Sequence, residues 1–272
     1  MSKVAVAMSV YKSDTVYNLR IAIDSILKQS YDNFDFYISV DGEVTVDVKT
    51  LLCDYNENND NVHITVNNIN RGLATRLNEI IEIVVEKGYY DFLARMDADD
   101  ISSPNRLSRQ VEFMENNTNI DVLGSDVEEV SENGDVVFYK RMTNTHERIA
   151  KEIIKKCPFN HPTVMFKMNI FREGFRYKSE LMNTQDYYLW VDLLSAGKIF
   201  ANINEPLLKF RISNDFHSRR GLKKAVNDVN SRIYAFKNLD VLSLSNLAHT
   251  LFLFLLRLSP KKIKIVAYKY LR

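Results

Sequence analysis

Apolar residues in the first hundred positions alternate between two spacings. Short apolar runs have the length of β-strands, and between them apolar residues recur every three or four positions, as on one face of a helix. Leu73, Leu77 and Ile81, for example, mark one face of a predicted helix. In chain order, the predicted elements are a strand at Val4–Val10, a helix after Asp14, a strand at Phe34–Val40, a helix over 44–57, a strand at Val62–Val66, a helix from Gly72 to Lys87 and a strand at Phe92–Met96.

This alternation predicts an α/β fold, a Rossmann-like and mostly parallel sheet with helices on both faces. In such sheets, ligands bind beyond the carboxyl ends of the strands. Tyr11, Asp41, Arg71 and the group Asp97–Asp99 all fall at those ends. We therefore expect these residues to gather at one edge of the sheet.

Beyond Pro104 the alternation loosens, and single turn or cap residues define the elements. Asn133-Gly134 is a turn signal that joins two strands into a hairpin. Thr184 is suited to cap a helix, and Gly197 to end it. The expected elements are a helix from Pro104 to about Asn116, hairpin strands at Ile120–Val130 and Val136–Arg141, a helix from Asn144 or Thr145 to Lys156, a strand at Thr163–Lys167, a helix over Gln185–Ala196, strands at Lys198–Ile203 and Leu207–Ile212, and helices from Leu222 onward.

Three carboxylates, on Asp97, Asp99 and Asp100, fall within four residues at the end of a predicted strand. They repel one another unless a cation lies between them, so the spacing suggests a divalent metal that holds a phosphate-bearing ligand. Alternatively, Asp100, Ser102 and Ser103 cap and charge the helix that follows. That alternative leaves Asp97 and Asp99 unexplained.

The composition is typical of a globular protein and argues against a nucleic-acid-binding or membrane-spanning one. The 272 residues, 46% of them hydrophobic, suffice for a large core. Because 36 basic and 35 acidic residues nearly cancel, no overall field favours nucleic acid as a partner. Cys53 and Cys157 lack metal-binding spacing and fit reduced thiols in a cytosolic compartment. With no signal peptide pattern and no apolar run of the ~20 residues needed to span a bilayer, we expect a cytoplasmic protein.

Seven motifs lie in order between Ser2 and His217. They are MSVYKSD, ISVDG, NRGLATRLN, ARMDADD, FNHPTV, TQDYYLW and FRISNDFHS. Together they resemble the family 2 glycosyltransferases of the GT-A fold, in particular the bacterial enzymes that build O-antigen and other surface polysaccharides. The resemblance implies transfer of a sugar from a nucleotide donor to an acceptor hydroxyl, with inversion at the anomeric carbon.

The resemblance also implies roles on the nucleotide side. Asp41 would accept a hydrogen bond from the nucleobase, although an Asp-Gly turn residue is the alternative. Tyr11 would pack on the base, unless it is a surface tyrosine. Arg71 would meet the base or a phosphate, or else pair with Asp97. Asp97 itself would face the ribose.

Asp99 would hold Mn²⁺ or Mg²⁺, which suit oxygen ligands equally well, between the two donor phosphates. His217 would complete the metal shell, unless it faces solvent. Asp100 would either support the site through hydrogen bonds or cap the helix. Arg219 and Arg220 would close over the diphosphate, or else form a solvated basic turn.

The attacking hydroxyl needs a base, and the resemblance assigns that role to Asp186. Relatives often carry Glu-Asp at this place, whereas this chain has Gln185-Asp186, which removes one reason to expect a raised pKa at Asp186. The alternative is an acidic residue in the first turn of a helix. His161 resembles a family position near the acceptor pocket, or is a turn residue before a proline.

We expect a GT-A catalytic domain over 1–220, with a nucleotide-sugar half at 1–100 and an acceptor half at 101–220, and a helical extension over 221–272. Leu247–Leu258 is intensely apolar but too short to span a bilayer, and five of the last twelve residues are basic. This composition fits an anchor on the inner face of the cytoplasmic membrane. A helix packed on the catalytic domain or on a dimer partner is the alternative, and the oligomeric state stays open.

The sequence thus predicts transfer of a hexose, with glucose or galactose favoured, from a UDP-sugar to a lipid-pyrophosphate-linked acceptor sugar. A dTDP- or GDP-sugar donor stays possible. A nucleotidyltransferase would need a glycine-rich phosphate loop near the N-terminus, and MSVYKSD has no glycine. A non-catalytic membrane scaffold would not need acids at three separate strand or helix ends.

Overall fold

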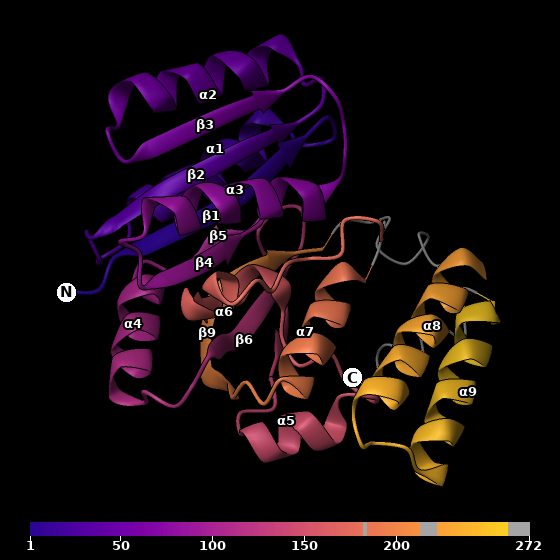
Figure 1. Ribbon diagram of the computed structural model, residues 1–272. Coiled ribbons are helices and arrows are strands. Elements are labelled where there is room, and N and C mark those ends of the chain that lie inside the picture. The colour runs from indigo at the N-terminus through magenta and orange to yellow at the C-terminus, as the bar shows by residue number, and fades with distance from the viewer. Residues whose placement is uncertain (182–183, 213–221, 261–272) are drawn as a thin grey trace.

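A nine-stranded sheet runs through the computed structural model, which describes residues 1–181, 184–212 and 222–260 (Figure 1). Across the sheet the order is β3-β2-β1-β4-β8-β6-β9-β5, and β7 pairs with β6. The strands are β1 (Val4–Tyr11), β2 (Phe34–Asp41), β3 (Val62–Asn67), β4 (Phe92–Met96), β5 (Ile101–Ser102), β6 (Val122–Val130), β7 (Val136–Lys140), β8 (Met165–Lys167) and β9 (Phe200–Arg211).

The first half of the chain forms the parallel part of the sheet, as its alternating pattern predicts. Strands β3, β2, β1 and β4 are parallel neighbours, so their carboxyl ends share one edge. Helices α1 (Val16–Leu27) and α2 (Val46–Asn58) pack on one face, and α3 (Leu73–Lys87) packs on the other. Because helices cover both faces, every residue of β2 is buried.

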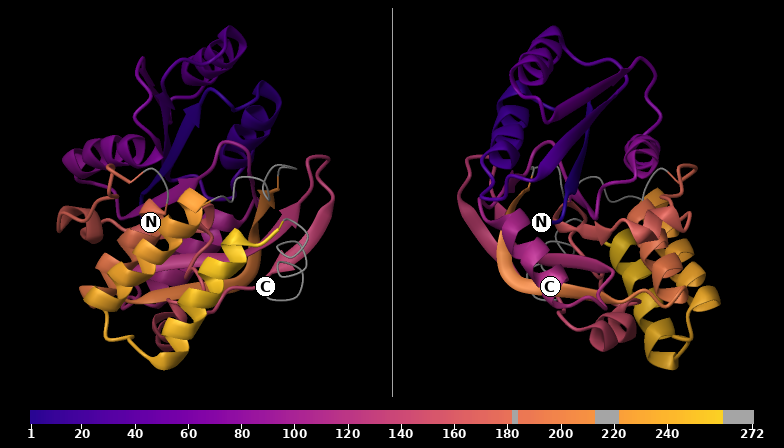
Figure 2. Two further views of the ribbon diagram at one scale, coloured as in Figure 1. Left: turned by 90° about the vertical axis from the view of Figure 1, so that its right-hand side faces the viewer. Right: turned by 60° about the vertical axis from the view of Figure 1, so that its left-hand side comes forward.

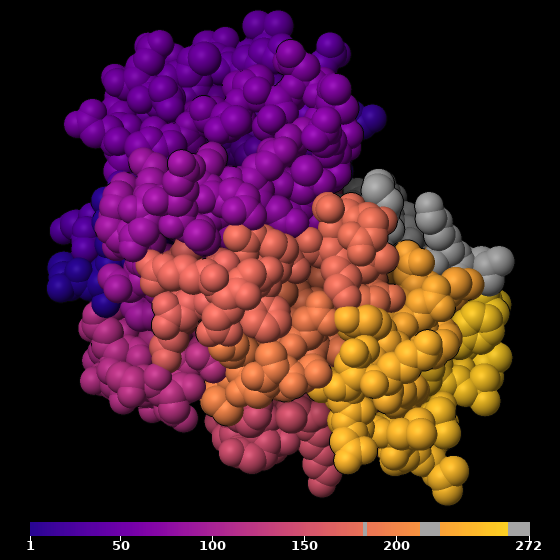
Figure 3. Space-filling view, in the orientation of Figure 1, coloured from indigo at the N-terminus to yellow at the C-terminus, as the bar shows by residue number. Residues whose placement is uncertain are grey.

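The second half continues the same sheet with antiparallel and parallel pairs. Strand β8 runs antiparallel to β4 and β6, and β6 is parallel to β9. The helices of this half are α4 (Arg106–Asn116), α5 (His146–Glu152), a 3₁₀ turn (His161–Thr163), α6 (Asn169–Arg172) and α7 (Gln185–Ser195). Figure 3 shows this half, magenta to orange, directly beneath the indigo and purple N-terminal half.

Two sequence predictions in this half are wrong. Lys198–Ile203 and Leu207–Ile212 are not separate strands but parts of one strand, β9. The register of β6 shifts beside Pro206, and such an irregularity accommodates a residue without an N–H. Helix α5 ends at Glu152 rather than Lys156, and the next residues form turns in which the N–H groups of Lys155 and Lys156 both donate to the carbonyl of Glu152.

Two antiparallel helices, α8 (Leu222–Asn238) and α9 (Leu244–Leu258), form a hairpin beside α7 (Figures 1 and 2). Ser243 caps α9 by accepting the N–H of Asn246. An ion pair of 2.8 Å between Arg257 Nε and Asp228 Oδ2 joins the two helices. The predicted helical extension is therefore helical over its described part, and α8 packs on the body.

Gly124 on β6 lies against a crowded part of the core. A Cβ at this position would lie 2.3 Å from Asn202 Oδ1 and 2.6 Å from Phe159 Cδ1. Asn202 has little freedom to move, because its Nδ2 donates to the carbonyls of Thr143 and Pro158. Only glycine fits here without displacing this side chain.

We predict that Gly124→Ala lowers the free energy of unfolding by about 1–3 kcal/mol, the usual range for overpacking. Urea unfolding followed by circular dichroism measures this loss. The six other glycines that the structure describes all have positive φ, so exposed Asp60→Ala serves as the control for a surface substitution. Unchanged stability of Gly124→Ala would contradict the packing described here.

Candidate active site

The carboxyl ends of β1, β2 and β4 bring together the residues that the first half of the sequence singles out. Tyr11 is paired in register with Asp41 across β1 and β2. Tyr11 is 39% exposed, whereas Asp41 is buried. Asp97 follows the last residue of β4, on the other side of β1. This edge therefore offers an exposed ring, a buried carboxylate and a partly exposed carboxylate.

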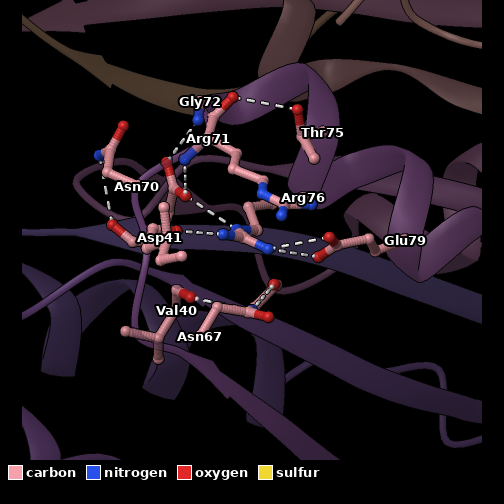
Figure 4. A network of polar contacts seen from close by, with 11 residues as sticks. Val40, Asp41, Asn67, Asn70, Arg71, Gly72, Thr75, Arg76 and Glu79 are labelled. Atoms are coloured by element: carbon pink, nitrogen blue, oxygen red, sulfur yellow. Dashed lines mark hydrogen bonds and ion pairs between the residues drawn. The ribbon is translucent and has the colours of Figure 1, made fainter.

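Asp41 organises the loop between β3 and α3 (Figure 4). Its Oδ1 accepts the backbone N–H of Arg71 and the Nε–H of Arg76, both at 2.8 Å. Its Oδ2 accepts the backbone N–H of Gly72, also at 2.8 Å. The side chain of Asn70 donates to the backbone carbonyl of Asp41. Asp41 thus fixes the backbone from which the exposed side chain of Arg71 projects.

Arg76 is a buried partner of Asp41 that sequence reasoning missed. Only 2% of the residue is exposed, and its guanidinium also bonds both carboxylate oxygens of Glu79 and the carbonyl of Ile69. A buried ion pair holds its geometry well when further hydrogen bonds satisfy its remaining N–H groups. The available signal was an arginine at position 76 within the apolar face of the helix, between Leu73 and Leu77.

The acidic end of β4 is organised by a second buried arginine. Arg95 is 1% exposed, and its guanidinium donates to Asp97 Oδ1 and to the carbonyl of Met96. Asp97 therefore pairs with Arg95. The alternative pairing of Asp97 with Arg71 is wrong, since no such ion pair occurs within 1–181, where both residues are described.

Asp100 does not cap a helix, so the capping interpretation is wrong. The two-residue strand β5 follows Asp100, and α4 begins only at Arg106, after Asn105 in the cap position. Asp100 is 1% exposed, and its Oδ1 accepts the backbone N–H of Arg211 at 2.9 Å. Burial, followed by the charges of Asp97 and Asp99, raises its pKa well above the ordinary value.

Asp99 is exposed as a residue, but its carboxyl lies among like charges. Partial removal from water, followed by the charge of Asp97, raises the pKa of Asp99 to about 6. Asp14 is an additional acid that sequence reasoning did not assign to the site. Its carboxylate accepts the N–H of Tyr11, and burial together with the charges of Asp99 and Asp97 raises its pKa to about 7. A cation at this point would relieve the repulsion, so the carboxylates fit a hard metal ion.

Further metal ligands from the protein are not evident. Within the described ranges 1–181, 184–212 and 222–260, no three His, Cys, Asp or Glu side chains converge to hold a metal by themselves. His217, Arg219 and Arg220 lie outside the described residues. Their predicted roles at the metal and the diphosphate stay predictions.

Asp186 lies on a different element, in the first turn of α7. Thr184 precedes this helix with φ of 64°, the one positive φ of a residue other than glycine in the described part of the chain. A β-branched residue rarely adopts this conformation, and such strain is typical of functional sites. Burial raises the pKa of Asp186, while hydrogen bonds from the backbone N–H groups of Tyr187 and Asp186, and after them the charges of Lys224 and Arg95, act in the opposite sense. Burial thus replaces the missing acidic neighbour as the reason for a raised pKa.

His161 starts a 3₁₀ turn, as its interpretation as a turn residue before Pro162 expects, and its role near an acceptor pocket stays a prediction. Its Nε2 lies 2.8 Å from the hydroxyl of Tyr177. Burial, followed by the charge of Arg95, lowers the pKa of His161 well below its ordinary value, so the imidazole is neutral. Burial also raises the pKa of Tyr177. A neutral pair of this kind suits a hydroxyl-bearing ligand better than a charged one.

Comparison with known proteins gives the family. The sequence model described as Glycosyl transferase family 2 matches residues 5–175. The chain is 32% identical to the O-antigen biosynthesis glycosyltransferase WbnJ of Escherichia coli, across 79% of this chain and 81% of that protein. It is 30% identical to the UDP-Gal:alpha-D-GlcNAc-diphosphoundecaprenol beta-1,3-galactosyltransferase of Escherichia coli, across 86% of this chain and 84% of that protein.

The fold has solved counterparts. The mannosyltransferase PcManGT from Pyrobaculum calidifontis, solved in complex with GDP-Man and Mn²⁺, superimposes with a TM-score of 0.63 at 13% identity, across 92% of this chain and 68% of that chain. At this identity the likeness concerns the fold alone, and it is the GT-A fold that the motifs imply. With more than half of its length matched, the chain belongs to glycosyl transferase family 2.

Proposed function

We propose that this transferase moves a hexose, glucose or galactose, from a UDP-sugar to a lipid-pyrophosphate-linked acceptor sugar, with inversion, during O-antigen or surface polysaccharide synthesis. The observation that carries the proposal is the gathering of Tyr11, Asp41 and Asp97 at one edge of the sheet, with Asp186 on a separate helix. The names of the two Escherichia coli relatives support the pathway, the UDP donor and the lipid-linked acceptor. The GDP-Man complex of PcManGT keeps a GDP-sugar as the alternative donor.

The nucleotide lies against the loops that follow β1, β2 and β3. Tyr11 offers an exposed ring on which a base can pack. Among the described residues, Asp41 Oδ2 accepts a single N–H, so one of its lone pairs remains for a nucleobase N–H. Arg71 projects a guanidinium from the loop that Asp41 holds, and Asp97 accepts from the ribose hydroxyls. Arg219 and Arg220 supply further positive charge for the diphosphate.

Asp99 would hold Mn²⁺ or Mg²⁺, with His217 as a further ligand. These ions are commonly bound through one or two carboxylates plus substrate phosphates, which agrees with the few acids present here. When bound, the ion neutralises charge on the departing nucleoside diphosphate. Asp14 and Asp97 add negative potential at the same point and so favour the cation.

Asp186 takes the proton of the acceptor hydroxyl as that oxygen attacks the anomeric carbon. The bond from the anomeric carbon to the diphosphate oxygen breaks on the opposite side, which inverts the configuration, and UDP leaves with the bonding electrons. The base must be ionised to accept the proton. Because burial raises the pKa of Asp186, kcat rises with pH until that raised pKa is passed.

In this proposal, the hairpin of α8 and α9 provides the surface that binds the membrane. Helix α9 contains no Asp or Glu, and its exposed apolar residues recur at helical spacing. These residues are Leu244, Leu247, Leu251, Phe252, Leu255 and Leu258. Residues 222–272 carry ten Lys and Arg against two Asp, a net charge of +8, whereas residues 1–221 carry −7. Apolar side chains beside basic ones favour an anionic bilayer surface, here the inner face of the cytoplasmic membrane.

No helix in the described part of the chain has the length and apolar character needed to cross a bilayer. We propose a peripheral association through the exposed apolar face of α9.

We predict that Asp186→Asn lowers kcat by about 10²–10⁴-fold, the usual contribution of a general base, with little change in UDP affinity. Asp99→Ala abolishes transfer and also removes the metal dependence of UDP binding. UDP release assays and calorimetric titration of UDP with Mn²⁺ measure the two effects, with exposed Asp60→Asn as the control. Retention of most turnover by Asp186→Asn would disprove the assignment of the base.

We predict that the double variant Leu251→Glu/Leu255→Glu floats less with vesicles of anionic phospholipid, because both residues lie more than half exposed on α9. Turnover of a short, water-soluble acceptor analogue stays the same. Val46→Glu, at a residue 76% exposed on α2, is the matched control and floats like the wild type. If the wild type and both variants floated equally, the membrane surface would be contradicted. If, in addition, only the double variant lost a dimer, α9 would bind a protein partner instead.

A further inference from the structure

Arg95 contacts the donor side and also anchors a segment of the acceptor side. Its guanidinium donates to the Asp97 carboxylate. Its backbone N–H donates to the carbonyl of Val164 at 2.8 Å, which fixes the end of the 3₁₀ turn that carries His161. A single residue of β4 thus sets the position of elements on both sides of the proposed reaction centre.

The acceptor-side segment is in turn fastened to the nucleotide half. His161 contacts the hydroxyl of Tyr177, and Tyr177 exchanges two hydrogen bonds with the side chain of Asn78 on α3, at 2.8 and 2.9 Å. Arg176 beside it forms an ion pair of 2.7 Å with Glu82, also on α3. The turn that carries His161 is therefore held in place by Arg95 and, through Tyr177 and Arg176, by α3.

Stability alone does not account for Arg95. Its Nε–H is buried and has no hydrogen-bond partner within the described residues. A buried charge with an unpaired N–H is a poor source of stability, and apolar side chains of similar volume often replace buried charges at no loss. What Arg95 does fix is the direction of the Asp97 side chain, which is 33% exposed and otherwise able to rotate.

We infer that Arg95 is a positioning residue that holds the Asp97 carboxylate toward the nucleotide donor. The inference rests on the proposed function, in which Asp97 meets the ribose. It names a residue that acts through Asp97 and does not itself touch the donor.

Arg106 provides a matched control close to Arg95. It is also fully buried and carries the same charge, yet it bonds to Gln110 Oε1, Met96 Sδ and the carbonyl of Arg95, and its hydrogen bonds do not include Asp97. If the acids needed only a buried positive charge nearby, loss of Arg95 and loss of Arg106 would lower the affinity for the donor equally.

Calorimetric titration with UDP and Mn²⁺ tests the inference in the full-length protein. We expect Arg95→Met to weaken UDP binding by about tenfold or more, the scale of a charge-assisted hydrogen bond, and to raise the donor KM more than it lowers kcat. Asp97→Asn should weaken binding similarly. The double variant should bind no more weakly than Asp97→Asn, because Arg95 acts through that carboxylate.

Arg95→Lys should recover part of the affinity, since one ammonium donor can still reach Asp97. It also serves as the test variant if Arg95→Met does not fold, as judged by circular dichroism. Arg106→Met should lower thermal stability and leave UDP affinity unchanged. The inference would be overturned if the losses of UDP affinity in Arg95→Met and Asp97→Asn multiplied in the double variant. It would also be overturned if Arg106→Met lost as much UDP affinity as Arg95→Met. A wild-type protein that does not bind UDP with Mn²⁺ would instead contradict the proposed function.

Discussion

The site depends on pairing between acids at the strand ends and arginines buried beneath them. Two unit charges 4 Å apart repel by about 1 kcal/mol in water and by several times more near a protein surface, so a crowd of carboxylates needs compensating charge. Arg95 provides it for Asp97 after β4, and Arg76 provides it for Asp41 at the end of β2, on the far side of β1. Arg106, a third buried guanidinium, forms hydrogen bonds to Gln110, Met96 and the carbonyl of Arg95 instead of to these acids, and burial with the nearby charge of Arg95 lowers its pKa to about 9.

This arrangement separates two chemical tasks. The acids at the end of β4 and in the first loop form a negative region that suits a cation and, through it, a diphosphate. The base candidate Asp186 lies on α7, where burial raises its pKa, and backbone hydrogen bonds, followed by the charges of Lys224 and Arg95, limit the rise. In the proposed function, the donor side stabilises the leaving group and the acceptor side takes the proton. Arg95 is close enough to affect both.

Sequence patterns predicted the parallel half of the fold well. There, short apolar runs typical of strands alternate clearly with segments whose apolar residues recur every three or four positions, as in helices. They missed β5, whose two residues are too short for any period, and they divided β9 at Pro206, where tertiary pairing overrides the usual effect of proline. Local cap chemistry suggested helix capping by Asp100, whereas a distant backbone N–H from Arg211 is its partner. Arg76 and Arg95 escaped notice because the burial of an arginine depends on a partner that only the fold brings near.

Anomalous diffraction from crystals grown with UDP and Mn²⁺ is the most direct test of the central claim, that the β4 acids hold the leaving group while Asp186 stays apart from it. The account predicts a manganese peak beside the Asp99 carboxylate and the UDP diphosphate, the uracil ring against Tyr11 and Asp41, and no contact between Asp186 and the metal. A nucleotide bound at another edge of the sheet, or manganese coordinated by Asp186, would contradict it.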